Sequence, residues 1–479
     1  MIATRGHLLV DGDGGTTWHS DTPAAVARVR VVHPDGAAFE VDAGDPGRLL
    51  AVTLSPMSSK DRAGLLADLV PDPIWVQGFV AAVDQGGGQR QFEGPPRLGA
   101  DWSRVAEVEA LNRWMLQPVD DALLTVDRGL SWYDAGLPDE AAPLLRRSSA
   151  TLVELAERTL AGDLPAAAWD SVRHAVTVAA SLLDAEDLDQ PELARLAEEF
   201  QEEPPEHSPG RSTDDARANY EPMYMGADSQ TSGTVHAISG HVDPALVPPR
   251  VLAWRGAQEP ELVGSHIEGS AGVEVSVNLA DAALAEDREA TMIVAYAALA
   301  ATGEPWSSVA LASDSSGRVL TGVIPVHGHD VQGLVFGVRR LGTQEPLRAD
   351  LLGRQLAQVD RLMIDSWNVA RLASTARYGG AARDLRWSQE TAVRLAATAL
   401  ERLGDAILDV EARRRAALRS GAKPSSPVPE WQLDAVKRRR RAVLARLDEL
   451  ERPPGIRAHR EPPTFAELLL VLDGPSPAT

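Results

Sequence analysis

The 479-residue sequence contains no cysteine, and lysine occurs only at Lys60, Lys423 and Lys437. The absence of cysteine excludes disulfides, thiolate metal sites, iron–sulfur clusters and a cysteine nucleophile. The other 44 positive charges are arginine. No lysine lies in a G-x-x-x-x-G-K-[ST] loop or in the V-A-I-K strand of protein kinases, which argues against the usual machinery for nucleotide phosphates. We therefore expect no cofactor.

Long hydrophobic runs are also missing. No apolar run approaches the roughly 20 residues that cross a bilayer, and Met1–Gly15 has neither the charged n-region nor the apolar h-region of a signal peptide. These absences predict a cytoplasmic protein without membrane insertion. A hydrophobic content of 44% over this length allows about two to four domains with more than one core.

Positive charge is scarce overall and unevenly distributed. The chain has 47 basic and 69 acidic residues, a net charge of −22. Residues 345–479 hold 23 basic and 18 acidic residues (net +5), whereas residues 1–344 hold 24 and 51 (net −27). Because a strongly negative surface repels nucleic acid and anionic membranes, only the C-terminal part is suited to meet a polyanion. The acidic part is better suited to solubility or to a basic partner.

The first two hundred residues are predicted as a β-rich segment (1–95) followed by a helical module (96–201). A hairpin is expected around the turn His33–Gly36, with further strands at Leu49–Leu54 and Ile74–Val83. From Trp102 the apolar spacing changes to the helical period and fits four or five helices.

Residues 202–232 are polar, rich in proline and without periodicity, which predicts a flexible linker between separately folding parts. The apolar island Tyr220–Met225 inside it is either a docking peptide or, as we favour, a contact that holds the linker on a neighbouring domain.

Residues 233–344 are predicted as an antiparallel β-sandwich of immunoglobulin-like general build, because short strands recur with turn signals between them. The expected strands are Val251–Arg255, Leu262–Ile267, Val273–Leu279, Thr291–Leu299, Ser307–Ala312, Arg318–Val326 and Val331–Arg339. The Ala-rich segment Asp281–Ala290 leaves one alternative open, in which a helix continues through Thr291–Ala301 and the domain becomes an α+β sheet.

The helical period returns over residues 345–452, which are predicted as a bundle of three long helices. The second helix is expected to end at Ser420–Pro424 and the third to span about Pro429–Leu450. Residues 453–479 are predicted as a tail. The fold class expected for the whole chain is therefore multidomain α+β.

The segment Leu8–Thr17 runs from a short strand into an Asp-x-Asp-Gly turn at Asp11 and Asp13. It resembles the opening motif of the haloacid-dehalogenase phosphatases, and the resemblance implies Asp11 as nucleophile and Asp13 as acid/base. The sequence departs from that family by an extra glycine before the threonine, and the next segments are predicted as hairpins instead of a strand–helix alternation. Since Asp and Gly are also the usual residues of tight turns, we favour a hairpin turn.

A second candidate site is the group His327, His329 and Asp330, the only close histidine pair with a carboxylate. Two imidazoles and an aspartate bind zinc when they converge. The flanking strand-like runs place these residues at a hairpin tip, where glycine and aspartate are expected and histidines are solvated. We therefore favour a turn and predict no bound metal.

The basic run Lys437, Arg438, Arg439, Arg440 and Arg441 is the third candidate. Five consecutive helical residues point in all directions around the helix, so they do not form one stripe suited to a nucleic-acid groove. Acidic neighbours leave residues 429–451 at only net +1. These features favour a solvated helix, or one docked on an acidic protein surface, over nucleic-acid binding.

Together these patterns favour a non-enzymatic cytoplasmic adaptor or regulatory subunit that binds other proteins in a multi-component assembly. Two alternatives stay open: a metal-dependent hydrolase or phosphatase, and a nucleic-acid-binding subunit that uses the C-terminal arginines.

Overall fold

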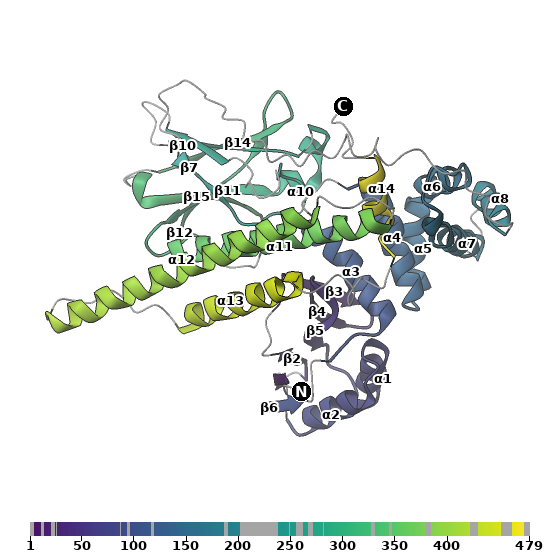
Figure 1. The fold of residues 1–479 in the computed structure, drawn as a ribbon, viewed down its shortest axis with the longest axis horizontal. Helices are drawn as coiled ribbons and strands as arrows, with labels where there is room; N and C mark the ends of the chain where they lie inside the picture. The colour runs from purple at the N-terminus through teal and green to yellow at the C-terminus, as the bar shows by residue number, and fades with distance from the viewer. Residues whose placement is uncertain are drawn as a thin grey trace.

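A computed structural model describes the chain from residue 4 to residue 473. The segments it leaves out are 11–13, 21–23, 25, 87, 93–95, 116–118, 186–189, 202–237, 249, 255–261, 267–271, 281, 327–330, 344–346, 379–384, 422–429 and 452–461. The described residues form a mixed α+β structure with several antiparallel sheets, as the sequence predicts (Figure 1). The predicted linker and the island Tyr220–Met225 lie outside the described residues.

The N-terminal part contains a six-stranded antiparallel sheet in the order β3-β4-β5-β2-β1-β6. Its strands are β1 (Thr4–Val10), β2 (Thr16–Ser20), β3 (Arg28–His33), β4 (Ala37–Asp42), β5 (Asp45–Leu54) and β6 (Gly88–Phe92). The hairpin expected around His33–Gly36 is present as β3 and β4, which pair in register from Arg28↔Asp42 to His33↔Ala37.

The prediction of a strand at Ile74–Val83 is wrong, because this segment is helical. Between the fifth and sixth strands lie α1 (Ser59–Leu69) and α2 (Pro73–Asp84). Asp72 caps α2 by accepting hydrogen bonds from the backbone N–H groups of Ile74 and Trp75, and Pro73 occupies its first turn. This largely apolar run is thus a half-buried helix, a case in which periodicity alone does not separate helix from strand.

The helical module has six α-helices among its described residues, one more than the largest number expected. They are α3 (Ala100–Trp114), α4 (Asp121–Asp134), α5 (Pro138–Arg147), α6 (Ser149–Leu160), α7 (Trp169–Ala185) and α8 (Pro191–Glu199), with the 3-10 turn η1 (Ala166–Ala168) before α7. The helices pack with the N-terminal sheet around one apolar core that includes Trp18, Phe39 and Val172.

Two further sheets follow, an antiparallel one ordered β13-β14-β10-β9-β7 and a second one ordered β12-β11-β15-β8, which is antiparallel except that β8 is parallel to β15. Their strands are β7 (Ile238–Ser239), β8 (His241–Val242), β9 (Leu262–His266), β10 (Gly272–Asn278), β11 (Ile293–Leu299), β12 (Pro305–Ala310), β13 (Ala312–Ser313), β14 (Val319–Pro325) and β15 (Leu334–Arg340). One core contains residues of both sheets, among them Val275 and Phe336. The arrangement supports a two-sheet domain, while its immunoglobulin-like build stays a prediction.

The alternative in which a helix continues through Thr291–Ala301 is wrong, because most of this segment forms a strand. After the 3-10 turn η2 (Ala282–Glu286) and the short helix α10 (Arg288–Thr291), the chain enters β11 and pairs with β12 and β15. A last 3-10 turn, η3 (Val331–Gly333), precedes β15. The strand expected at Val251–Arg255 is not formed in its described part, where the chain turns and makes one isolated bridge between Leu252 and Leu279.

The three long C-terminal helices are present as predicted. They are α11 (Leu351–Tyr378), α12 (Leu385–Arg419) and α13 (Glu430–Glu451), and they share a core that includes Val359, Leu403 and Val443. The segment predicted as a tail contains a further helix, α14 (Phe465–Asp473).

One apolar core contains residues from four of the predicted segments. Ile364 and Trp367 of α11, and Phe465 and Leu468 of α14, belong to the same core as the N-terminal sheet and helices. Figure 1 shows α11 crossing the middle of the molecule, with the two later sheets on one side and the N-terminal part on the other. No helix in the described part of the chain is long and apolar enough to cross a membrane.

Candidate interaction surface

Two of the three sites predicted from the sequence are not described. Asp11 and Asp13 lie outside the described residues, and so do His327, His329 and Asp330. Within the part of the chain that the structure describes, no group of three or more His, Asp or Glu side chains converges in a way that would hold a metal ion. The phosphatase and zinc hypotheses therefore stay untested.

The basic run Lys437–Arg441 lies in the middle of α13, and Arg439 is its inward-facing member. The Arg439 side chain forms an ion pair with Asp360 of α11, and its Nη2 donates to Asp360 Oδ2 at 2.9 Å. The two side chains are only 26% and 11% exposed. This pair fixes how α13 is rotated about its axis, and with it the direction of every other residue in the run.

The remaining members of the run face outward. Lys437 Nζ lies 3.3 Å from Asp434 Oδ1, and this pair is largely solvated. Arg438, Arg440 and Arg441 are exposed, and their side chains make no ion pair or hydrogen bond with the described residues. At about 100° per residue, the four outward residues spread over about 160° of the helix. We call Lys437, Arg438, Arg440 and Arg441 the basic face of α13.

Asp360 also links α13 to the sheets. Arg348 Nη1 donates to Asp360 Oδ2 at 2.6 Å, while its Nε and Nη2 bind the two oxygens of Asp243, each at 2.6 Å. Burial alone would lower the pKa of Arg348, but the hydrogen bond to Asp243 and the charge of Asp360 outweigh burial and raise it. Asp243 is fully buried directly after β8, so the ion pairs run without a break from a sheet through α11 to α13.

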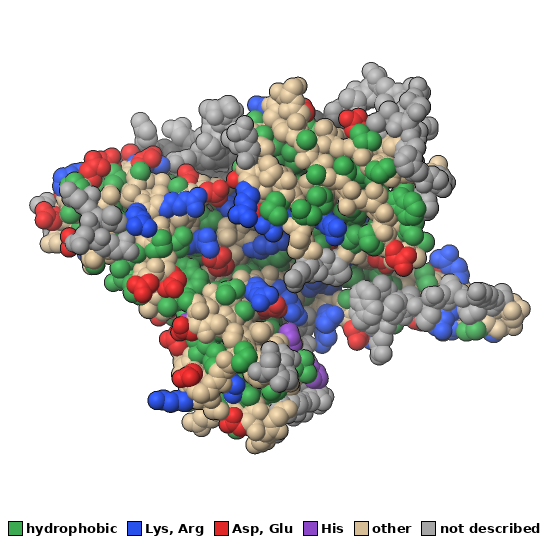
Figure 2. Space-filling model, turned by 180° about the vertical axis from the view of Figure 1, so that it is seen from behind, with side chains coloured by type: hydrophobic (Ala, Val, Ile, Leu, Met, Phe, Trp, Pro, Cys, Tyr) green, Lys and Arg blue, Asp and Glu red, His purple; other side chains and the backbone are tan. Residues whose placement is uncertain are grey.

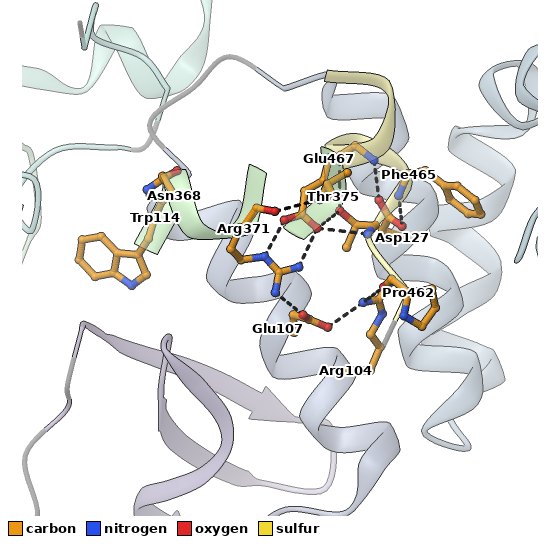
Figure 3. Close-up of polar contacts among 12 residues, drawn as sticks. Arg104, Glu107, Trp114, Asp127, Asn368, Arg371, Thr375, Pro462, Phe465 and Glu467 are labelled. Atoms are coloured by element: carbon orange, nitrogen blue, oxygen red, sulfur yellow. Dashed lines mark hydrogen bonds and ion pairs between the residues drawn. The ribbon is translucent and has the colours of Figure 1, made fainter. Parts of the chain in front are cut away.

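A second group of ion pairs lies farther along α11 and is more deeply buried (Figure 3). Arg371 donates from Nε and Nη2 to the two carboxylate oxygens of Glu467 in α14, at 2.5 and 2.6 Å. Its Nη1 forms an ion pair with Glu107 of α3, and Glu107 in turn accepts from Arg104 Nη1 at 2.7 Å. Burial would raise the pKa of Glu107, but the charges of Arg371 and Arg104 lower it to about 2.

Helix α14 is held at its first turn by a carboxylate from the helical module. Asp127 of α4 accepts hydrogen bonds from the backbone N–H groups of Phe465 (2.9 Å) and Ala466 (3.1 Å). Thr464 and Glu467 form a reciprocal capping box, because each side chain accepts from the backbone N–H of the other, at 3.3 and 3.1 Å. Burial raises the pKa of Asp127 to about 7, against the opposing charge of Arg104 and the two backbone hydrogen bonds.

The end of α12 lies beyond the cores. Ile407 is its last buried residue, and none of the residues from Leu408 to Arg419 is buried. Leu408 is 61% exposed and Leu418 is 55% exposed. Figure 1 shows this end of α12 extending away from the sheets, and Figure 2 shows the projection from behind with basic side chains along it.

Comparisons of the chain with protein-family models, curated proteins and solved structures find no match. A proposal for the function therefore rests on two features of the structure. Two groups of ion pairs fix α11, α13 and α14, and charged and apolar side chains are exposed on the outside of α12 and α13.

Most of the residues in these ion pairs were not found from the sequence. Arg371 meets Glu107 and Glu467 across large sequence separations, and no local pattern marks such a contact. The helix α14 did leave a signal, since Thr464 and Glu467 have the S/T-x-x-E spacing of a capping box before an apolar run.

Proposed function

We propose that the protein is a non-enzymatic adaptor that binds an acidic surface of another protein through the basic face of α13. The observation that carries this proposal is the division of the basic run. Arg439 turns inward to Asp360, and the rest of the run is left exposed on a helix whose orientation that ion pair fixes. Guanidinium groups presented in this way suit bidentate pairing with carboxylates of a partner.

The charge of the remainder of the chain favours a protein partner over a nucleic acid. The net charge of −22 opposes the approach of a polyanion over long distances. A local acidic patch on a protein can still pair with the four outward side chains at short range. Salt screens the negative charges that lie farther away than the Debye length of about 8 Å, so these charges oppose the contact only weakly. The proposal also includes three predictions from the sequence. These are an immunoglobulin-like build of the sandwich, the domain boundaries given above and a cytoplasmic location.

The test compares two variants with the same change in net charge. One is R438S/R440S/R441S on the basic face, and the control R147S/R173S/R195S removes three exposed arginines from the helical module. Proteins cross-linked to the tagged full chain in its native host should be lost with the first variant and retained with the control. Equal recovery with both would show that the basic face is not the binding surface.

A duplex-DNA and RNA titration separates the nucleic-acid alternative. At roughly physiological salt we expect binding no tighter than the non-specific range of about 10⁻⁴ to 10⁻⁶ M. Submicromolar binding that R438S/R440S/R441S abolishes and the control retains would replace the adaptor proposal by nucleic-acid binding.

A further inference from the structure

The exposed side of α12 carries a regular pattern that the basic face of α13 does not explain. Six exposed residues follow one another at alternating intervals of four and three: Glu401, Asp405, Leu408, Ala412, Arg415 and Arg419. With 3.6 residues per turn, this spacing keeps all six on one side of the helix. We call these six residues the outer face of α12. It lies opposite the apolar side that packs on α11 and α13 through Leu403 and Ile407.

The charges on the outer face are sorted along the helix. The two acidic residues come first, the two apolar residues lie in the middle, and the two basic residues come last. A second copy of the same face, laid alongside in the antiparallel direction with a two-fold axis beside Val410, brings opposite charges together. The facing residues are then Glu401 with Arg419, Asp405 with Arg415, and Leu408 with Ala412.

We propose that the protein self-associates by antiparallel pairing of the outer face of α12 with the same face of a second copy. A two-fold axis repeats each contact, so the pairing contains four ion pairs around a small apolar centre. Parallel pairing in register would place like charges opposite each other, which costs free energy, so the charge order selects the antiparallel direction.

The side chains of the outer face are available for such contacts. Glu401 and Asp405 form no ion pair with other described residues, and Leu408 is 61% exposed. Arg415 lies 4.0 Å from Glu411 in its own helix, but both side chains are solvated, so this contact is weak and can be exchanged for another. Two acidic groups and one leucine therefore gain partners on pairing.

The size of the face limits the strength of the pairing. Nineteen residues of helix from Glu401 to Arg419 extend over about 28 Å at 1.5 Å per residue. One pair of such helices buries less than the roughly 1,200 Å² of a standard interface, which places the dimer among weak complexes with a dissociation constant on the order of micromolar. Since the contacts are ionic, added salt should weaken the dimer.

Sedimentation velocity of the full chain over a range of concentrations tests the proposal. Wild-type protein should pass from monomer to dimer in the micromolar range. The variants E401R/D405R and R415E/R419E each make the outer face carry one sign of charge, so each should weaken self-association at least tenfold. An equimolar mixture of the two restores every opposite-charge pair and should form a heterodimer of near wild-type affinity.

Recovery in the mixture distinguishes pairing from misfolding, because two misfolded variants would not rescue each other. The control R402E/R413E makes the same charge change as R415E/R419E on another side of α12 and should dimerise like the wild type. The variant R438S/R440S/R441S should also dimerise normally, which keeps this test separate from that of the adaptor function. A wild-type chain that stays monomeric, or a mixture that does not recover, would overturn the proposal.

Discussion

The two ends of α11 carry ion-pair groups of opposite design. Near its start, the carboxylate of Asp360 lies between two arginines, Arg348 and Arg439. Near its end, the guanidinium of Arg371 lies between two carboxylates, Glu107 and Glu467. The first group joins a sheet and α13 to α11, and the second joins α3 and α14 to the same helix. One helix thereby fixes four other parts of the chain.

The partners of Asp360 are more accessible to water than the partners of Arg371. This difference determines how much stability is lost when either central residue is removed. Arg348 and Arg439 are 22% and 26% exposed, so water can solvate them if Asp360 is lost. The carboxylates of Glu107 and Glu467 are only 6% and 1% exposed. Without Arg371, the buried carboxylate of Glu467 would lose its cationic partner while Glu107 would keep Arg104, and leaving a buried charge unpaired is the costly way to break a buried ion pair.

The largest effect is therefore expected for Arg371→Ala, which should destabilise the structure around α14 by about 3–5 kcal/mol. Urea unfolding and hydrogen exchange of residues 465–473 would measure the loss. As a control, Arg371→Ala combined with Glu467→Gln removes the unpaired carboxylate, leaves the Arg104–Glu107 pair in place and should recover part of the stability. If the single and double variants were equally unstable, lost packing rather than unpaired charge would be the cause.

Asp360→Asn should have a smaller effect, about 1–3 kcal/mol. Arg348 would keep both hydrogen bonds to Asp243, and Arg439 would reach water. The loss should appear as faster hydrogen exchange in α13, with little change in α14. A cost equal to that of Arg371→Ala would contradict the argument that solvent access separates the two ends of α11.

Asp127, which holds the first turn of α14, gives this part of the structure a pH dependence. Its pKa is raised to about 7 by burial, so the folded state binds a proton more tightly than the unfolded state between about pH 4 and pH 7. The stability from this group is thus fully present below about pH 4, falls as the pH rises from about 4 to about 7 by at most about 1.4 kcal/mol per pH unit, and levels off above pH 7. Comparing urea midpoints of the wild type and Asp127→Asn from pH 5 to 8 isolates this slope, and parallel profiles would show that Asp127 does not titrate there.

The comparison also shows how far the sequence could predict the fold. Local patterns found the hairpin at His33–Gly36 and the three long helices, because period and turn chemistry are local. The strand prediction for Ile74–Val83 is wrong because its apolar residues fit the strand period as well as the helical period. Asp72, which caps the segment at its start, is the residue that favours a helix. The candidate surface was predicted in part. The basic run was recognised, but its division depends on Asp360, 79 residues away in the sequence, which no local pattern indicates.

The smallest effect is expected at Lys437, an outward-facing member of the run that Arg439 anchors. Its pair with Asp434 spans one helical turn, with side chains 70% and 54% exposed, and such pairs contribute about 0.5 kcal/mol or less. Lys437→Ala should therefore leave the melting temperature and the urea midpoint of α13 nearly unchanged, whereas Arg439→Ala should lower both because it leaves Asp360 without its α13 partner. Lys437 and Arg439 would then differ in their effect on stability because the Lys437 side chain faces outward and the Arg439 side chain faces inward. If Lys437→Ala were as destabilising as Arg439→Ala, the division of the run into an anchoring residue and an exposed basic face would be wrong.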